Sequence, residues 1–128
     1  TLAQEGAKYN VKINALAPTA GTRMTEGLID DKAFAMFAPD TVTPAVLFLV
    51  SEDAPTRTIL AAGAGAFAVA KIVETEGMWL PESEQTSEAV AANWAQISDG
   101  GERALQAGFE QGIKMVGQAM EGLGIDTN

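Results

Sequence analysis

The fold is decided by the stretch Val11-Lys-Ile-Asn-Ala-Leu-Ala-Pro-Thr-Ala-Gly-Thr-Arg-Met-Thr25. Its first half alternates apolar and polar residues and then places two apolar residues together, a pattern that predicts a buried β-strand over residues 11–17. Pro18 ends this strand, and small residues then form a loop that reaches Thr25. In open α/β sheets, ligands bind beside loops that leave the carboxyl ends of strands. We therefore expect a ligand site in this loop.

The rest of the chain alternates helical and extended patterns. Capping residues and apolar spacing predict helices, and β-branched runs between glycines predict strands. The expected helices are 2–8, 24–29, a helix that starts at Pro39 and runs to Val50, one that starts at Thr86 or Ser87, and 102–121; the expected extended segments are 58–62 and 66–74. Strands that alternate with helices indicate an α/β protein.

The composition excludes several classes of function. The net charge is −9 and the eight basic residues are scattered, so the chain lacks the basic patch that nucleic-acid binding requires. Cysteine and histidine are absent, which removes the usual zinc ligands and the commonest general base. No apolar run reaches the length of about 18 residues that a membrane helix needs. We expect no metal, no nucleic acid and no membrane partner.

The central stretch resembles the short-chain dehydrogenase/reductases, in which a strand ending Asn-Ala-x-x-Pro precedes a loop with Thr-x-Met-Thr. Within that family it is similar to the (3R)-hydroxyacyl-CoA dehydrogenase domain of multifunctional enzymes and their bacterial relatives. The matching pieces are Ala17–Thr25, the Gly-Ala-Gly run at 63–65 and Ser87–Trp94, and the resemblance covers residues 1–98. It implies the C-terminal portion of a Rossmann-type doubly wound parallel sheet over residues 1–80. A helical C-terminal extension over 81–128 would follow.

The resemblance implies an NAD- or NADP-dependent oxidoreductase that oxidises a secondary alcohol. A 3-hydroxyacyl-CoA is the preferred substrate and a hydroxysteroid the near alternative. The family's glycine-rich loop and its Ser, Tyr and Lys are absent in their usual arrangement. We therefore interpret the chain as the C-terminal half of a fuller enzyme, inactive alone and without a catalytic residue of its own. Its partner would be the missing N-terminal half or a second subunit of a homo-oligomer.

The resemblance also assigns roles within the loop. Pro18, Thr19, Ala20, Gly21 and Thr22 would line the nicotinamide site, because small residues let a flat ring approach the backbone. Arg23, Met24 and Thr25 would face the substrate, with Arg23 suited to a phosphate of coenzyme A. The alternative is a loop without a ligand, in which Thr22 or Thr25 caps a helix.

Two further motifs favour structural interpretations. Gly63–Ala68 fits a relaxed dinucleotide fingerprint and would allow a free-standing ligand domain, but the residues that follow do not predict the helix that the fingerprint requires. A backbone turn is the better interpretation. Tyr9 and Lys12 are three positions apart, not the four of the family's catalytic pair, which favours a surface position for Tyr9. The carboxylate pairs Asp30-Asp31 and Glu82/Glu84 are expected at the surface.

A second hypothesis is that the chain has no catalytic function. Thr19 stands where the family has glycine, and Thr22 follows Pro18 by four positions where the family has five. These departures fit a degenerate dehydrogenase half that acts as a structural or interaction subunit. The terminal sequence Gly-Ile-Asp-Thr-Asn is not a peroxisomal address, which favours a cytoplasmic protein.

Overall fold

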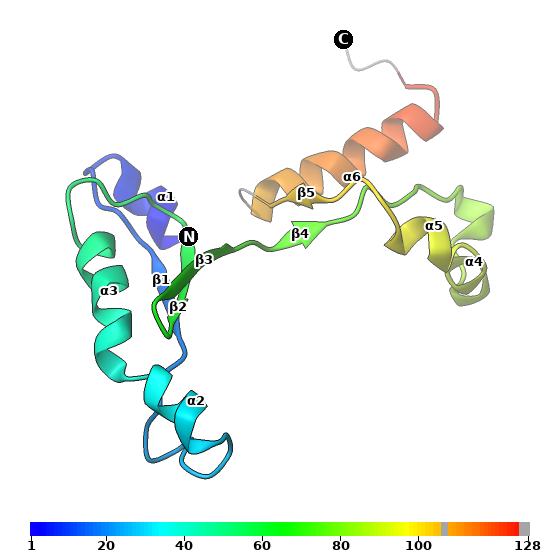
Figure 1. Cartoon of the computed structure of the whole chain (residues 1–128). Helices are drawn as coiled ribbons and strands as arrows, with labels where there is room; N and C mark the ends of the chain where they lie inside the picture. The colour runs from blue at the N-terminus through cyan, green and yellow to red at the C-terminus, as the bar shows by residue number, and fades with distance from the viewer. Residues whose placement is uncertain (106–107, 126–128) are drawn as a thin grey trace. The chain divides into compact units, whose positions relative to one another are not determined.

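The computed structural model describes residues 1–105 and 108–125, and the chain forms two compact units, Thr1–Lys71 and Ile72–Asn128 (Figure 1). Each unit has its own sheet. We describe the units separately. The division after residue 80 that the sequence suggests remains a prediction about domains.

The first unit contains helices and strands in alternation. Its elements are α1 (Leu2–Ala7), β1 (Ala15–Pro18), α2 (Asp31–Met36), η1 (Pro39–Val42), α3 (Thr43–Leu49), β2 (Ile59–Gly63) and β3 (Ala66–Ala70). Strands β1 and β2 pair in parallel, with Ala15 opposite Ile59 and Pro18 opposite Ala62. A parallel pair needs a crossover connection, which α2, η1 and α3 provide. The predicted α/β class is confirmed.

Strand β3 adds to β2 in the antiparallel direction, which gives a three-stranded mixed sheet. The turn between them places Ala64 and Gly65 at positive φ, 49° and 76°. Two successive residues at positive φ form the hairpin turn whose twist matches the flanking strands. The turn interpretation of Gly63–Ala68 is therefore confirmed, and the helix that a dinucleotide fingerprint needs is absent from these residues.

The first strand is shorter than the sequence predicts. Residues 11–14 are not strand, and β1 begins at Ala15. Asn14 is the physical reason, because its side-chain Nδ2 donates to the Pro55 carbonyl at 2.7 Å and its Oδ1 accepts the Thr58 N–H at 3.1 Å. The Asn14 side chain thus bonds to the backbone of residues 55–58, where a longer strand would use its own backbone groups.

The prediction of a helix over residues 24–29 is wrong. These residues form turns, and Gly27 at φ 76° interrupts them. The helix starts later, at Asp31, because the Asp30 carboxylate accepts the N–H groups of Lys32 and Ala33, both at 3.1 Å. An aspartate that satisfies these free donors is a strong N-cap, so the helix begins directly after Asp30.

A small apolar cluster holds helix and sheet together. The cluster consists of Val42, Ala45, Leu60 and Ala62, with Leu16, Ala20 and Leu49 packed against it. The helix predicted from Pro39 is confirmed, although its first turn, η1, is a 3₁₀ turn. The other face of α3 and all of β3 are exposed: Leu47 is 63% exposed and Val69 56%.

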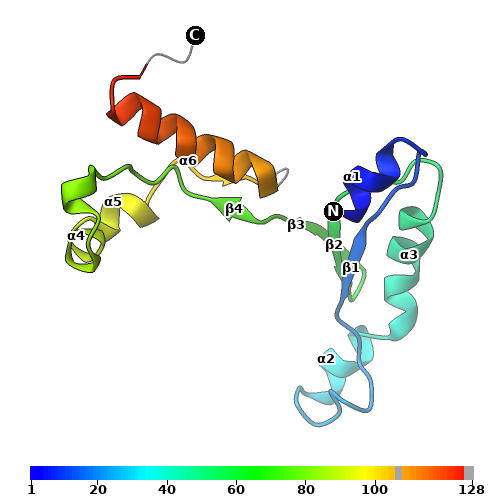
Figure 2. The same ribbon diagram turned by 180° about the vertical axis from the view of Figure 1, so that it is seen from behind.

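The second unit contains one long helix together with short helices and strands. Its elements are β4 (Val73–Glu74), η2 (Glu82–Glu84), α4 (Ser87–Ala92), α5 (Trp94–Ser98), β5 (Arg103–Ala104) and α6 (Gly108–Gly122) (Figure 2). The predicted cap at Thr86 is confirmed, since its hydroxyl accepts the Ala89 N–H at 3.1 Å. The expected start of the last helix at residue 102 is wrong. Residues Arg103–Ala104 pair antiparallel with β4, so the backbone there is extended.

Helix α6 presents its polar side to its own unit. Gln111, Lys114 and Gln118 bond to residues 74–76, whereas Phe109 and Ile113 of the apolar stripe are 79% and 57% exposed. Two predicted helical positions, 106 and 107, and the last three residues, 126–128, lie outside the described residues. Within residues 1–105 and 108–125, no helix combines the length and the apolar character that a membrane crossing requires.

Candidate functional site

The predicted loop leaves β1 at the carboxyl ends of two parallel strands. Thr19 extends the ladder by donating its N–H to the Ala62 carbonyl at 2.8 Å. A Cβ built on Gly63 would lie 2.6 Å from the Thr19 carbonyl oxygen. The loop therefore crosses directly over the end of β2, the edge of a parallel pair at which α/β proteins bind ligands.

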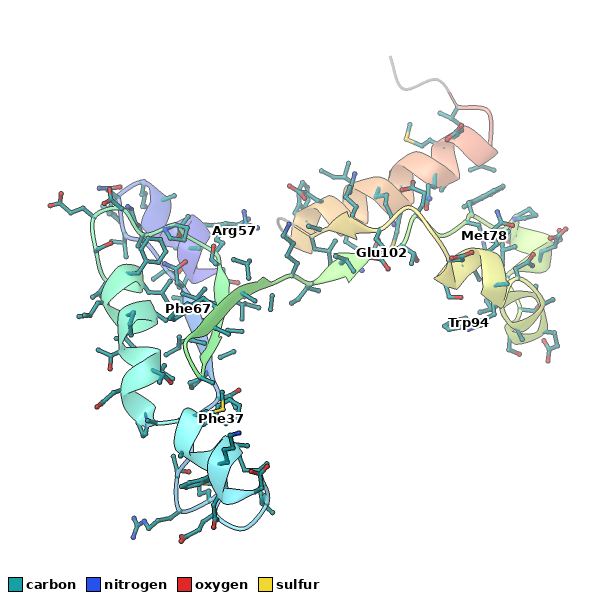
Figure 3. The ribbon with its side chains drawn as sticks, viewed as in Figure 1. Phe37, Arg57, Phe67, Met78, Trp94 and Glu102 are labelled. Carbon is teal, nitrogen blue, oxygen red and sulfur yellow. The ribbon has the colours of Figure 1, made fainter. Side chains whose placement is uncertain are left out.

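The middle of the loop is anchored beneath α2. Gly21 donates its N–H to the Phe37 carbonyl at 2.6 Å, and a Cβ on Gly21 would meet the Phe34 carbonyl oxygen at 2.9 Å. Phe37 lies at the end of α2, beside the strand ends (Figure 3). The close approach explains why glycine occupies position 21. The loop is thus fixed at the sheet and at α2.

Two threonines close the loop into a single turn. The Thr22 N–H donates to the Thr25 hydroxyl at 2.8 Å, and the Met24 N–H donates to the Thr22 hydroxyl at 3.3 Å. The Thr25 hydroxyl donates toward the carbonyls of Thr22 and Ala20, at 3.0 and 3.3 Å. This reciprocal arrangement resembles a capping box. Thr22 does cap a turn, as the alternative interpretation expects, but no helix follows it.

The residues predicted to line the nicotinamide site differ in their exposure to solvent. Pro18, Thr19 and Thr22 are exposed, whereas Ala20 and Gly21 are half-buried. The Thr22 hydroxyl accepts one hydrogen bond and donates none within the described residues. It is therefore free to donate to a ligand. The structure brings Pro18–Thr22 together at one edge, and their contact with a nicotinamide stays a prediction.

The three predicted substrate residues do not behave alike. Arg23 is exposed and forms no ion pair within the described residues, and Met24 is 89% exposed. Thr25 is half-buried and its hydroxyl is already bonded within the loop. The geometry suits Thr25 to holding the loop, whereas the side chains of Arg23 and Met24 are free to meet a ligand.

Sequence reasoning missed the role of Asn14. Its amide joins the start of β1 to the segment Pro55–Thr58 through two hydrogen bonds. Nearby, the Ile13 N–H donates to the Thr56 hydroxyl at 3.0 Å and the Arg57 N–H to the Ile13 carbonyl at 2.7 Å. These bonds fix the alignment of β1 with β2. The available signal was an amide at a polar position close to the start of the predicted strand.

Tyr9 lies at the surface, as expected. Its ring is 71% exposed, and the Lys8 ammonium sits 4.9 Å from the ring centre, in the geometry of a cation–π contact. Lys12 donates to the backbone carbonyl of Glu52. Among the described residues, no group of three acidic side chains converges on a point where a metal could bind.

Among the described residues, the second unit holds one ion pair. The Lys114 ammonium lies 2.5 Å from the Glu74 carboxylate, and their side chains are only 12% and 19% exposed. The hydrogen bond from Lys114 is the main cause that lowers the pKa of Glu74, and Gln111 adds a second bond. Burial opposes these effects by raising the pKa of the carboxyl. No sequence pattern predicts this pair, because its partners are forty positions apart on different elements.

Comparison with known proteins gives a consistent set of relatives. No protein-family model matches the chain. A Mycobacterium tuberculosis protein named as a short-chain type dehydrogenase/reductase is 36% identical over 100 residues, which cover 77% of this chain and 35% of that protein. The peroxisomal hydratase-dehydrogenase-epimerase of Saccharomyces cerevisiae is 34% identical over 102 residues, 77% of this chain and 11% of that protein.

A mammalian relative and a solved structure agree with these two. The peroxisomal multifunctional enzyme type 2 of Mus musculus is 36% identical over 102 residues, 77% of this chain and 14% of that protein. The solved structure of full-length peroxisomal multifunctional enzyme type 2 from Drosophila melanogaster matches with a TM-score of 0.78 and 25% identity, over 95% of this chain and 23% of that one. The chain thus spans about a third or less of the curated relatives described here.

Proposed function

We propose that this chain, a relative of part of the short-chain dehydrogenase/reductases, supplies the nicotinamide- and substrate-facing loop of an NAD- or NADP-dependent oxidoreductase. One observation carries the proposal: a loop fixed at the carboxyl ends of two parallel strands leaves the Thr22 hydroxyl free to donate. The resemblance to dehydrogenases over 77% of the chain supports it.

The loop fits a dinucleotide in shape and in charge. Ala20 and Gly21 carry almost no side chain, so a flat ring can approach the backbone there. Arg23 is the one charged residue between Pro18 and Thr25, and no carboxylate in this segment repels an anionic cofactor or a CoA phosphate. A bound nicotinamide would supply the hydride acceptor. The Thr22 hydroxyl would hold its carboxamide, and Met24 would cover an apolar part of the substrate.

The preferred substrate is a 3-hydroxyacyl-CoA, with a hydroxysteroid as the near alternative. The glycine-rich phosphate loop and the Ser, Tyr and Lys for proton transfer would come from outside this chain, as a further part of a longer enzyme or another subunit. The exposed apolar residues of α3 and β3 favour contact with such protein. A cytoplasmic location remains a prediction, although several relatives carry the word peroxisomal in their names.

A loop graft tests the proposal. Residues 18–25 of this chain replace the matching segment of the yeast hydratase-dehydrogenase-epimerase, and reduction of NAD or NADP by a 3-hydroxyacyl-CoA is followed by absorbance. We expect the graft to support hydride transfer. Thr22→Ala in the graft should raise the KM for the cofactor about tenfold, the equivalent of ~1.4 kcal/mol. Arg23→Ala should raise the KM for the CoA ester and leave the KM for the cofactor unchanged.

The graft also separates the two hypotheses. A folded graft that reduces neither cofactor would support the non-catalytic subunit instead.

Substrate class is tested on the chain itself by nuclear magnetic resonance. Amide shifts at Arg23 and Met24 with a CoA ester, and none with a hydroxysteroid, would favour the acyl-CoA.

A further inference from the structure

The second unit contains a cavity that the proposed function does not use. It is open to solvent, its volume is about 520 Å³, and it is lined by Glu74, Thr75, residues 77–80, Gln85 and residues of α4, α5 and α6. Its apolar wall consists of Met78, Trp79, Leu80, Val90, Ile97 and Met115. Met78 of this wall lies in the second unit (Figure 3). We propose that this cavity binds a neutral, apolar small molecule that carries hydrogen-bond donors.

The charges of the lining exclude an ionic ligand. Glu74 and Lys114 are the charged residues of the lining, and they neutralise each other at 2.5 Å. The Lys114 ammonium also donates to the carbonyls of Thr75 at 2.7 Å and Glu76 at 3.1 Å. An ammonium has three donors, and these three partners use them all. A carboxylate, phosphate or amine entering the cavity would lose its hydration without gaining an ionic partner.

Three glutamines define the polar part of the lining. Gln85 donates through Nε2 to the Leu80 carbonyl at 3.0 Å, and Gln118 donates to the Glu76 carbonyl at 2.9 Å. Gln111 donates to the Glu74 carboxylate at 2.5 Å. Carbonyl and carboxylate oxygens only accept, so each amide must present its NH₂ group to them. The three amide oxygens accept no bond from the described residues, and a ligand with hydroxyl or amide N–H groups would satisfy them.

The size and the wall suit a small organic molecule. Ligand cavities in proteins hold roughly 300–1,000 Å³ and combine apolar walls with a few polar groups. The thioethers of Met78 and Met115 adapt to ligands of different shapes, and the Trp79 indole offers a flat face. All the lining residues belong to the second unit. The proposal therefore stands independently of the loop at Thr22.

Tryptophan fluorescence provides the test. The chain has two tryptophans, and Trp94→Phe leaves Trp79 as the sole reporter. The chain with this substitution is titrated with 1-octanol, octanoate and octylammonium, which share one alkyl length and differ in head group. We expect saturable binding of 1-octanol with a shift in Trp79 emission. The two ions should bind at least about tenfold more weakly, because their charge would be buried unpaired.

Three variants locate the binding. Val90→Phe fills the cavity and should abolish the octanol response, whereas Phe109→Ala, on the exposed stripe of α6, should leave it unchanged. Gln85→Ala removes an exposed acceptor and should weaken octanol about threefold with the circular dichroism spectrum preserved. Equal affinity for all three probes, or octanol binding that survives Val90→Phe, would mean adsorption to exposed apolar surface and would overturn the proposal. An absence of saturable octanol binding would overturn it as well.

Discussion

The carbonyl oxygen of Thr19 lies 2.6 Å from the point where a Cβ on Gly63 would stand. This contact joins the start of the loop that follows Pro18 to the last residue of β2. A Cβ atom does not approach backbone oxygen so closely, so the site and the sheet geometry depend on glycine at position 63. The φ angle of Gly63 is not positive, and contact rather than backbone conformation sets the requirement.

The first prediction is that Gly63→Ala destabilises the chain. The added methyl group must push Thr19 away from the strand, and overpacking of this kind costs about 1–3 kcal/mol. Urea unfolding followed by circular dichroism measures the loss. The matched control is Ala64→Gly, the next residue, which relieves an alanine at φ 49° and should raise stability or leave it unchanged. Equal effects of the two substitutions would contradict this account.

The second prediction concerns the unequal roles of the two loop threonines. Thr25→Val removes a hydroxyl that accepts from Thr22 and donates within the loop, and should cost about 1–2 kcal/mol. Thr22→Val removes only a long acceptor contact with Met24 and should cost less than about 0.5 kcal/mol. Denaturant unfolding of both variants checks the difference. Thr22→Val with the larger loss would reverse the assignment of their roles.

The third prediction uses two glycines of one helix. A Cβ on Gly122 would lie 2.2 Å from the Trp79 ring, whereas a Cβ on Gly117 would meet nothing within 4 Å. Gly122→Ala should therefore displace the indole and shift its emission. Gly117→Ala should stabilise α6 by up to about 1 kcal/mol, because alanine has the higher helix propensity. Fluorescence and thermal unfolding in the Trp94→Phe background separate the two, and an unshifted spectrum for Gly122→Ala would refute the contact.

The fourth prediction is a pH dependence of the second unit. The Lys114 hydrogen bond holds the pKa of Glu74 below its ordinary value of 4.5. A carboxyl whose pKa is lower in the folded state adds stability above its unfolded pKa and loses it as the pH falls through the folded pKa. The melting temperature should thus decrease below about pH 5. Glu74→Gln should decrease less steeply over that range. Identical pH slopes for the two proteins would exclude a role for Glu74.

The elements that depend on local pattern were predictable from the sequence. The strand ending at Pro18, the helix after Pro39 and the cap at Thr86 follow from apolar spacing, proline and capping chemistry. The burial predicted for this strand is wrong, because three of its four residues are exposed. The helix predicted over 24–29 fails for a local reason, Gly27 and the cap at Asp30, and other predictions fail where distant residues intervene. The first residues of the predicted strand are not strand, because the Asn14 amide bonds to a segment more than forty positions away. Residues 102–104 were expected in a helix, but Arg103 and Ala104 pair with β4.

The candidate site divides in the same way. The position of Pro18–Thr22 at the carboxyl edge followed from the strand and the proline. The inward role of Thr25 did not, because three polar contacts within the loop decide it. The cavity of the second unit was also invisible in the sequence, because its wall comes from four separate segments that only the fold brings together.

Two glutamines and one lysine hold α6 in position along its axis by hydrogen bonds to its own unit. Gln111 bonds to Glu74, Gln118 bonds to Glu76, and Lys114 between them bonds to all three consecutive residues of the extended segment Glu74–Glu76. A shift of α6 by one turn along its axis would detach all three and would also move Gly122 away from the Trp79 ring. Directional hydrogen bonds together with this close contact set the position of the helix, and they also fix the direction in which the exposed residues Phe109, Ile113 and Val116 point.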